Sequence, residues 1–319
     1  MKFYPLIFEP IFKERIWGGT KLKDYLNKSF KSNKIGESWE LSTVANDVSV
    51  VANGEFAGLN LNELIEKYPI ELLGSKSIEK FGLEFPLLFK FLDAKEDLSI
   101  QVHPNDELAK QRHNSFGKTE MWYVMQADEK ARLVVGFKNK TNKKDYLKHI
   151  EDKTLVAVLN ETPVKKGDTF FLETGTVHAI GAGVLIAEIQ QTSDITYRLY
   201  DWDRVDAKGI GRELHNDLAV EAINYEETNT KVQYENISNE SVNLVECPFF
   251  TTNILEVSEL YHWKKKKESF TVLMCTEGKF TLTTTNSKSE FKKGDTVLIP
   301  AILEEFQIIG ETSLLEITI

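Results

Sequence analysis

Two stretches of the chain that lie far apart in the sequence begin with the same turn. They are "VKKGDTFFLETGTVHAI" at 164–180 and "FKKGDTVLIPAILEEFQI" at 291–308. Each joins Lys-Lys-Gly-Asp-Thr to a short apolar run, and the upstream segments "TEMWYVMQADEKARLVVGF" and "SFTVLMCTEGKFTLTTT" are more weakly alike. An internal repeat of this kind indicates a duplicated β-unit. We therefore expect two related sets of short strands.

The remaining pattern also favours short strands. Apolar runs of strand length, bounded by turns that contain glycine, cover residues 86–92, 98–103, 120–125, 131–136, 169–172 and 184–191. Helices are predicted at 60–80, where Pro69 interrupts the spacing, at 143–159 behind a Thr141/Asn142 cap, and at 213–224. Together these elements predict a mainly β fold, an antiparallel sandwich or barrel with a few peripheral helices.

The two copies of the repeat differ at positions that can carry chemistry. The first copy contains Gly175 and His178, whereas Ile302 and Glu305 stand at the equivalent places in the second. One copy can therefore hold a functional site while the other is structural.

Composition excludes several classes of function. The formal net charge of −10 argues against nucleic acid as the main partner, although a local pocket can still be basic and bind a small anion. No apolar run approaches the roughly 20 residues of a membrane helix. The N-terminal segment lacks a small-residue cleavage site, and Cys247 and Cys275 form no disulfide framework. We expect a cytoplasmic protein with reduced thiols, and the sequence leaves its oligomeric state open.

The stretch "SIQVHPND" at 99–106 places polar side chains in alternation within an apolar run. Because residues two apart in a strand share a face, Ser99, Gln101 and His103 should point one way. Leu98, Ile100 and Val102 should point the other way. A solvent-exposed strand face is the simplest explanation of such a row. A metal site becomes the better explanation if further ligands converge on it.

Further polar side chains share strand faces elsewhere in the sequence, as the pairs Lys118 and Glu120, Glu188 and Gln190, and Asp194 and Arg198. An amide oxygen, two imidazoles and a carboxylate would meet if the strands bring together Gln101, His103, Glu120 and His178. This set of nitrogen and oxygen ligands suits zinc, with manganese, iron or cobalt feasible. A metal with one open position could polarise a carbonyl or hydroxyl of a substrate.

The chain resembles a known superfamily and, within it, a known family. Gly167, Gly175 and His178 follow the glycine–histidine spacing of the cupin barrel, with Glu173 in place of the usual proline. The segments "PLLFKFLDAKEDLSIQVHPND", "GKTEMWYV", "TVHAIGAG" and "QQTSDITYRLYDWDR" are similar to those of type I mannose-6-phosphate isomerases (phosphomannose isomerases) in their short bacterial form. Thr119 replaces a proline of the second segment. The similarity extends over almost the whole chain.

The resemblance implies a fold and a set of residue roles. The fold would be two cupin-type (jelly-roll) β-barrels from a degenerate duplication, a metal-binding domain with helical decorations at 1–240 and a degenerate cupin-like domain at 241–319. One zinc ion per chain would be held by Gln101, His103, Glu120 and His178. The catalytic residues would be Arg198, Lys118, Asp194 and Glu188, and the substrate-binding residues Trp17, Lys90 and Ser99. The large inserted helical domain of longer members has little room here.

The resemblance also implies an activity, the interconversion of D-mannose 6-phosphate and D-fructose 6-phosphate through a cis-enediol. Two alternatives stay open, a non-catalytic cupin that binds a sugar phosphate and a metal-dependent cupin oxygenase. The presence of Lys118, Asp194 and Arg198 beside the ligand set disfavours a pure binding protein, and oxygen consumption would identify an oxygenase. The sequence does not decide which of Glu188, Asp194 and Lys118 acts as the base.

Overall fold

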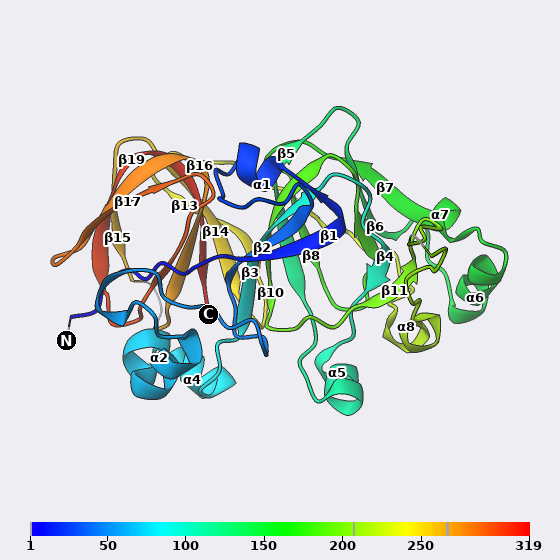
Figure 1. Cartoon of the computed structure of the whole chain (residues 1–319), viewed down its shortest axis with the longest axis horizontal. Coiled ribbons are helices and arrows are strands. Elements are labelled where there is room, and N and C mark those ends of the chain that lie inside the picture. Colours follow the sequence, from blue (N-terminus) through cyan, green and yellow to red (C-terminus); the bar gives the residue numbers. More distant parts are fainter. Residues whose placement is uncertain (1, 207, 266–267) are drawn as a thin grey trace.

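The computed structural model describes residues 2–206, 208–265 and 268–319, and Figure 1 shows three antiparallel sheets. The central sheet has seven strands in the order β1-β2-β3-β10-β5-β8-β12. Their bounds are β1 Ile11–Gly19, β2 Ile35–Leu41, β3 Leu87–Ala94, β10 Val184–Gln191, β5 Glu120–Ala127, β8 Thr169–Leu172 and β12 Lys231–Val232.

A second, five-stranded sheet covers one face of the central sheet. Its order is β11-β4-β9-β6-β7, with bounds β11 Tyr197–Tyr200, β4 Ile100–Val102, β9 His178–Ile180, β6 Arg132–Phe137 and β7 Leu159–Pro163. Leu92, Trp122 and Ile186 of the central sheet share a buried core with Leu133 and Ile180 of the second sheet. The outer face of the second sheet packs against α6 Lys143–Glu151, α7 Leu155–Val158 and α8 Asn216–Ala222.

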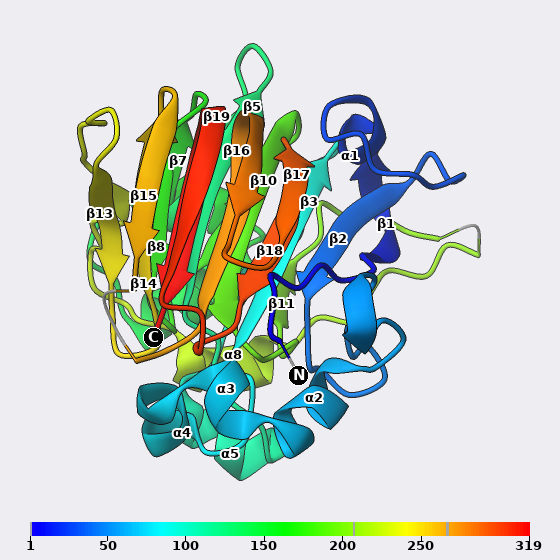
Figure 2. The same cartoon turned by 90° about the vertical axis from the view of Figure 1, so that its left-hand side faces the viewer.

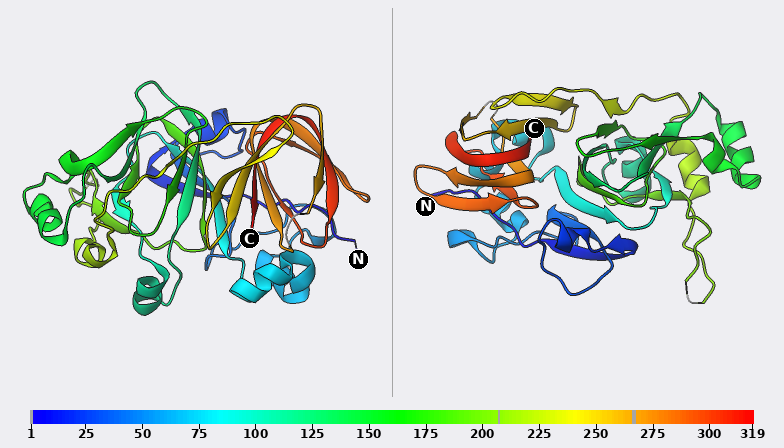
Figure 3. Two further views of the ribbon diagram at one scale, coloured as in Figure 1. Left: turned by 180° about the vertical axis from the view of Figure 1, so that it is seen from behind. Right: turned by 90° about the horizontal axis from the view of Figure 1, so that it is seen from above.

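The third sheet covers the opposite face of the central sheet, as the side view of Figure 2 and the top view of Figure 3 show. Its order is β13-β14-β19-β16-β17, with β15 paired to β19 and β18 paired to β16. The bounds are β13 Ser241–Glu246, β14 Thr251–Val257, β15 Leu260–Lys264, β16 Thr271–Thr283, β17 Lys288–Lys292, β18 Thr296–Ile299 and β19 Glu305–Thr318.

Alternation along the central strands sends side chains to both neighbouring sheets. Phe89 of β3 and Met121 of β5 pack against Val272 and Leu315 of the third sheet. The intervening residues, such as Lys90, point toward the second sheet. The central sheet therefore carries an apolar face toward the third sheet and a mixed polar face toward the second.

The predicted helix at 60–80 is three short helices that close the core between the central and third sheets. They are α2 Leu61–Lys67, α3 Pro69–Leu73 and α4 Ser75–Phe81. Asn60 caps α2 in a capping box with Glu63, and Pro69 occupies the first turn of α3. The proline ends one helix and starts the next, because it lacks the N–H that an interior position needs.

Several other predicted boundaries were wrong. The helix expected at 143–159 is interrupted between α6 and α7, and the one expected at 213–224 begins only at Asn216. The structure adds α1 Lys21–Asp24, η1 Gly54–Phe56 and α5 Asp106–His113, which the pattern did not predict. The bounds of β8 and β10 agree with the prediction. None of the helices in the described part of the chain has the length and hydropathy of a membrane span.

The two repeated turns have the same backbone structure. Asp168 Oδ2 accepts the N–H of Lys165 at 3.1 Å, and Asp295 Oδ2 accepts that of Lys292 at 2.8 Å. Gly167 has φ 90° and Gly294 has φ 91°, a left-handed conformation that favours glycine. The turns lead into β8 and β18 respectively, so the repeat seen in the sequence is also a repeat in the fold.

Candidate active site

A cavity of about 340 Å³ opens between the central and second sheets. Eight residues singled out in the sequence line it, namely Trp17, Lys90, Ser99, Gln101, Lys118, Glu188, Asp194 and Arg198. They come from five strands and the segments between them. The other lining residues include four charged or aromatic side chains that were not predicted, Arg15, Glu37, Trp39 and Arg212. Side chains from distant parts of the sequence therefore meet in one pocket.

Strand register explains why these side chains meet. Glu188 of β10 lies between Lys90 of β3 and Trp122 of β5, and Gln190 is the partner of Glu120. Residues paired in this way project from the same face of the sheet. The alternation predicted for Glu188 and Gln190 is thus correct, and it places their side chains under the second sheet.

Three buried side chains behind Lys118 form a group that could bind a metal: His103, Glu120 and His178. Their ligand atoms all lie within 4.8 Å of one another. His103 Nε2 is 3.7 Å from Glu120 Oε2, and His178 Nε2 is 3.4 Å from Glu120 Oε1. Two ligands of a tetrahedral ion at bond lengths of about 2.1 Å stand roughly 3.4 Å apart. The spacing therefore fits a single ion.

The hydrogen bonds of the two histidines fix which nitrogen faces the group. His103 Nδ1 bonds to the carbonyl of Ile195 at 2.8 Å, and His178 Nδ1 to that of Thr176 at 2.8 Å. A carbonyl only accepts, so each Nδ1 carries the hydrogen and each Nε2 presents a lone pair toward Glu120. Metal-binding histidines are held by outer hydrogen bonds of this kind.

Burial keeps both imidazoles neutral. It lowers the pKa of His178 to about 4 and that of His103 well below its usual value, and the charge of Lys118 acts in the same direction. Glu120 Oε1 is buried and has no hydrogen-bond partner among the described residues. An unsatisfied buried carboxylate oxygen beside two neutral imidazoles is a donor set that a divalent cation would complete.

Gln101 stands next to this group. It is the strand partner of His178, and its amide nitrogen is 3.2 Å from His178 Nε2. Turning the amide by 180° about its last side-chain bond puts the oxygen in the same place. Gln101 is therefore within reach as a fourth ligand, and that role stays a prediction.

One side-chain direction predicted for this strand was wrong. Leu98 was expected to point away from Ser99 and Gln101, but it lines the same cavity and belongs to the core between the central and second sheets. The reason is that regular strand structure begins only at Ile100. Ile100 and Val102 do lie on the outer face, as expected.

A network of charged groups connects the metal-ligand group to the cavity. Lys118 bonds to Glu120, and its Nζ is 3.0 Å from His103 Nε2. Lys90 Nζ donates to Gln190 Oε1 at 2.7 Å and is 3.3 Å from Glu188. Each cation in this layer thus has a polar or acidic partner.

The carboxylate of Glu188 is held in its ionised form. Its Oε2 accepts the indole N–H of Trp122 at 2.8 Å. Burial alone would raise the pKa of Glu188, but Lys118, Lys90 and this hydrogen bond lower it overall. Burial likewise acts to lower the pKa of Lys118, and Glu120 and Glu188 raise it overall.

Arg198 and Asp194 lie nearer the mouth. Arg198 is on β11, where its strand partner is Gln101, and its Nη1 donates to the carbonyl of Glu213 at 2.8 Å. Burial and the neighbouring Arg212 lower its pKa, from a value so high that it stays charged. Asp194 is exposed. The mouth therefore combines a fixed guanidinium with a carboxylate that solvent reaches.

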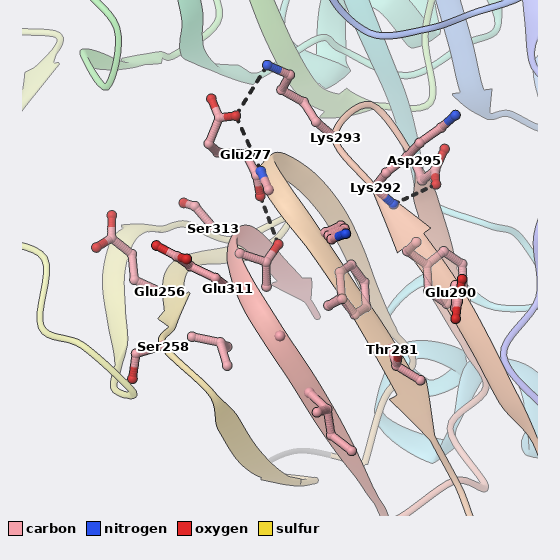
Figure 4. A pocket seen from close by; sticks show the side chains of 18 of the residues that line it. Glu256, Ser258, Glu277, Thr281, Glu290, Lys292, Lys293, Asp295, Glu311 and Ser313 are labelled. Atoms are coloured by element: carbon pink, nitrogen blue, oxygen red, sulfur yellow. Dashed lines mark hydrogen bonds and ion pairs between the residues drawn. The ribbon is translucent and has the colours of Figure 1, made fainter.

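A larger hollow of about 1300 Å³ lies on the third sheet, shown in Figure 4. Residues of β16, β17 and β19 line it, and Lys293 forms an ion pair with Glu277 at 3.2 Å. It contains none of the residues predicted from the sequence. Size alone therefore does not mark the site, and the smaller cavity holds the converging chemistry.

Comparison with known proteins places the chain in a family. Residues 6–159 match the model for "Phosphomannose isomerase type I, catalytic domain" and residues 240–319 that for "Mannose-6-phosphate isomerase, cupin domain". The chain is 42% identical over 311 residues to mannose-6-phosphate isomerase ManA of Bacillus subtilis, covering 96% of each protein. The chain belongs to the type I mannose-6-phosphate isomerase family.

Other members of this mannose-6-phosphate isomerase family are similar along their whole length. The enzyme of Streptococcus mutans is 34% identical, with 98% of this chain and 97% of that protein covered. The crystal structure of the mannose 6-phosphate isomerase from Bacillus subtilis superimposes with a TM-score of 0.90 at 34% identity, covering 99% of each chain. The family resemblance predicted from the sequence is confirmed.

Of the four charged or aromatic lining residues that were not predicted, only Glu37 and Trp39 had a signal in the sequence, and it was weak. Glu37 and Trp39 alternate within "IGESWELS", which is the pattern of a strand with one polar face. Trp39 is the strand partner of Lys90, and the indole N–H of Trp39 donates to Glu37 at 2.6 Å. Arg15 and Arg212 gave no signal, because only the strand register and the loop after β11 bring them to the cavity.

Proposed function

We propose that the protein interconverts D-mannose 6-phosphate and D-fructose 6-phosphate. Its relatives from Bacillus subtilis and Streptococcus mutans are named mannose-6-phosphate isomerases. The observation that carries this proposal is the convergence of eight predicted side chains on one cavity beside a buried His–Glu–His group. Such an isomerisation moves a proton between C2 and C1 through a cis-enediol and redistributes protons on O1 and O2. Function follows from this site and not from the fold alone.

We propose zinc, one ion per chain, as the resident metal, held by His103, Glu120, His178 and Gln101. The neutral imidazoles and the carboxylate support zinc, although the same set also accepts other divalent metals. When bound, the ion would supply Lewis-acid polarisation of the substrate oxygens. The chain's own residues then have to bind the sugar phosphate, move the proton and stabilise developing negative charge.

Arg198, Lys118, Glu188 and Asp194 are the proposed catalytic residues. Arg198 keeps its proton, so its part is to stabilise the charge of the enediolate from the mouth of the cavity. Glu188 and Asp194 are the carboxylate candidates for moving the proton between C1 and C2. Glu188 is buried next to Lys118, whereas Asp194 is exposed at the rim. Lys118 is the third candidate, next to the ligand group.

Trp17, Lys90 and Ser99 are the proposed substrate-binding residues. Trp17 would form an apolar wall, since its ring is buried and lines the cavity. Lys90 and Ser99 are buried side chains on the same lining and would offer a charge and a hydroxyl to the phosphate.

The finer architecture is also part of the proposal. We infer two cupin-type barrels that arose by duplication, with domains at 1–240 and 241–319. The shared turn geometry at Gly167 and Gly294 supports this division. A cytoplasmic location fits a sugar-phosphate substrate and stays an expectation.

A metal-exchange assay tests the function. Purified protein should isomerise mannose 6-phosphate, lose activity when a chelator removes its metal, and regain activity when zinc is returned. A protein that binds the sugar phosphate without turnover would be a binding cupin, and oxygen uptake with an iron-loaded protein would indicate an oxygenase. Full activity after verified metal removal would refute the role proposed for the ion.

A further inference from the structure

Arg15 lines the candidate active-site cavity and has no role in the assignments above. It lies on β1 two residues before Trp17, so both side chains project from the same face of the strand. The Arg15 side chain is 37% exposed, whereas Trp17 is buried. Arg15 therefore stands where the cavity opens to solvent.

The position of the Arg15 side chain is fixed by its neighbours. Its Nε donates to Glu37 Oε1 at 2.6 Å and its Nη1 to the carbonyl of Glu14 at 3.2 Å. Burial would raise the pKa of Glu37, but Lys90 and Arg15 lower it overall, so Glu37 is an ionised partner. No hydrogen bond within the described part of the chain engages Arg15 Nη2. One edge of the guanidinium is left for a ligand.

A glycine on the neighbouring strand makes this arrangement possible. A Cβ at Gly36 would come within 2.7 Å of Arg15 Cβ and within 2.5 Å of the Trp17 ring. The missing side chain lets Arg15 and Trp17 lie across β2. Their orientation toward the cavity is thus built into the strand pair.

The charges of the site indicate what this free edge would bind. A phosphate monoester carries about −1.5 to −2 near neutral pH. Lys90 is already 3.3 Å from Glu188 and 4.0 Å from Glu37, and Lys118 is bound to Glu120. These lysines are paired with carboxylates, and Arg198 is assigned to the enediolate above, so Arg15 is a further cation on the lining that could balance the charge of the phosphate. The planar fork of an arginine matches phosphate oxygens in geometry as well as charge.

We propose that Arg15 is a substrate-binding residue whose free guanidinium edge donates to the phosphate of the sugar phosphate. The proposal rests on the function proposed above. Arg15 on β1 would be a third residue that contacts the phosphate, together with Lys90 and Ser99. The phosphate would then lie on the side of the cavity formed by β1, and the reacting carbons would lie toward the His–Glu–His group.

The test compares Arg15→Gln with Lys13→Gln. Lys13 lies two residues earlier on β1 and pairs with Asp47, and it does not line the cavity, so its replacement removes the same charge from the same strand. The measurements are the Kd of inorganic phosphate by calorimetry and the KM and kcat for mannose 6-phosphate. We expect Arg15→Gln to raise Kd and KM by roughly 10- to 100-fold, the loss of a charge-assisted bond, with kcat changed by less than about threefold.

The Lys13→Gln control separates an effect of Arg15 itself from a general effect of removing a positive charge from β1. Lys13→Gln should leave Kd and KM within about twofold, because Lys13 pairs with Asp47 and does not line the cavity. Equal effects in the two variants would overturn the proposal, and so would a fall in kcat with Kd and KM unchanged. If Arg15→Gln does not fold, Arg15→Lys, which keeps the charge but loses the fork, should raise both constants several-fold, and no rise overturns the proposal. If the wild-type protein binds phosphate but does not isomerise mannose 6-phosphate, the proposed function is refuted. The Kd of phosphate for Arg15→Gln would still show whether Arg15 binds phosphate.

Discussion

Trp122 is a core residue that also contacts the candidate active site. Replacing it with phenylalanine would keep most of the core contact and remove the hydrogen bond to the site. The side chain is 1% exposed, its indole N–H donates to Glu188 at 2.8 Å, and its ring meets His178 edge-on at 5.3 Å between centroids. Phenylalanine keeps a ring in the core but removes the donor. Glu188 then loses the bond that fixes its carboxylate, and the core loses part of a buried ring.

The expected loss of stability follows from these contacts. A hydrogen bond to an ionised group contributes about 1.5–3 kcal/mol, and the smaller ring costs about 1–2 kcal/mol more. The total of about 4 kcal/mol should lower the unfolding midpoint by about 8 °C in a chain of this size. Because Glu188 would lose the donor that orients its carboxylate, we also expect kcat to fall by at least about tenfold. Thermal unfolding and steady-state kinetics measure both effects.

Trp263→Phe is the matched control. Trp263 is also buried and donates to a buried carboxylate, Glu316, but on the third sheet away from the cavity. It should lose similar stability and keep its kcat. An unchanged kcat in Trp122→Phe, or an equal fall in Trp263→Phe, would refute the reasoning that the indole of Trp122 holds Glu188 for catalysis.

Three further outcomes are expected. Chelation should lower the unfolding midpoint as well as abolish activity, because a bound ion stabilises the folded state, and zinc should restore both; an unchanged midpoint after verified metal loss would contradict a site that binds metal only when folded. Arg198→Ala should reduce kcat by about 100-fold or more with a normal circular-dichroism melt, and wild-type turnover would mean that the residue is misassigned. Burial raises the pKa of Asp93 from 3.8 to about 6, so folding favours its protonated form and wild-type stability should fall as pH rises from about 4 to 6. In Asp93→Asn this fall in the free energy of unfolding should be smaller by up to about 3 kcal/mol, as measured by urea unfolding at several pH values. If the free energies of unfolding of the two proteins changed with pH in parallel, the raised pKa of Asp93 would be contradicted.

Alternation and turn chemistry were sufficient to predict much of the site. Strands β3, β5 and β10 of the central sheet are eight residues long and apolar on one face, so the positions of Lys90, Glu120 and Glu188 follow from a period of two once the strands are recognised. The Lys-Lys-Gly-Asp-Thr turns are fixed locally by an aspartate and a glycine, and both form as the sequence indicates. These signals lie within a few residues of each other and need no tertiary information.

The predictions failed where tertiary contacts override local pattern. The helix expected from residue 213 starts late because the residues before it bond to Arg198. The carbonyl of Glu213 accepts a hydrogen bond from the Arg198 guanidinium, and His215 Nδ1 accepts one from the backbone N–H of Arg198 at 3.0 Å. The unpredicted α5 is mostly polar, but Asn105 caps it by accepting the N–H of Leu108, a start signal that the sequence does contain. Arg15 became a candidate only after the strand register was known.

The two copies of the repeat show how one β-unit can carry either a site or a core. His178 begins β9 and is buried against Glu120, whereas its counterpart Glu305 begins β19 and is exposed. The next residue, Phe306, stacks on Trp263 at 4.5 Å inside the apolar core of the third sheet. Aromatic rings therefore lie next to Glu305, where the first copy has the buried His103, Glu120 and His178 next to one another. The buried polar groups of the first copy cost stability unless they are paired, which explains why each lysine around Glu188 has a carboxylate within reach.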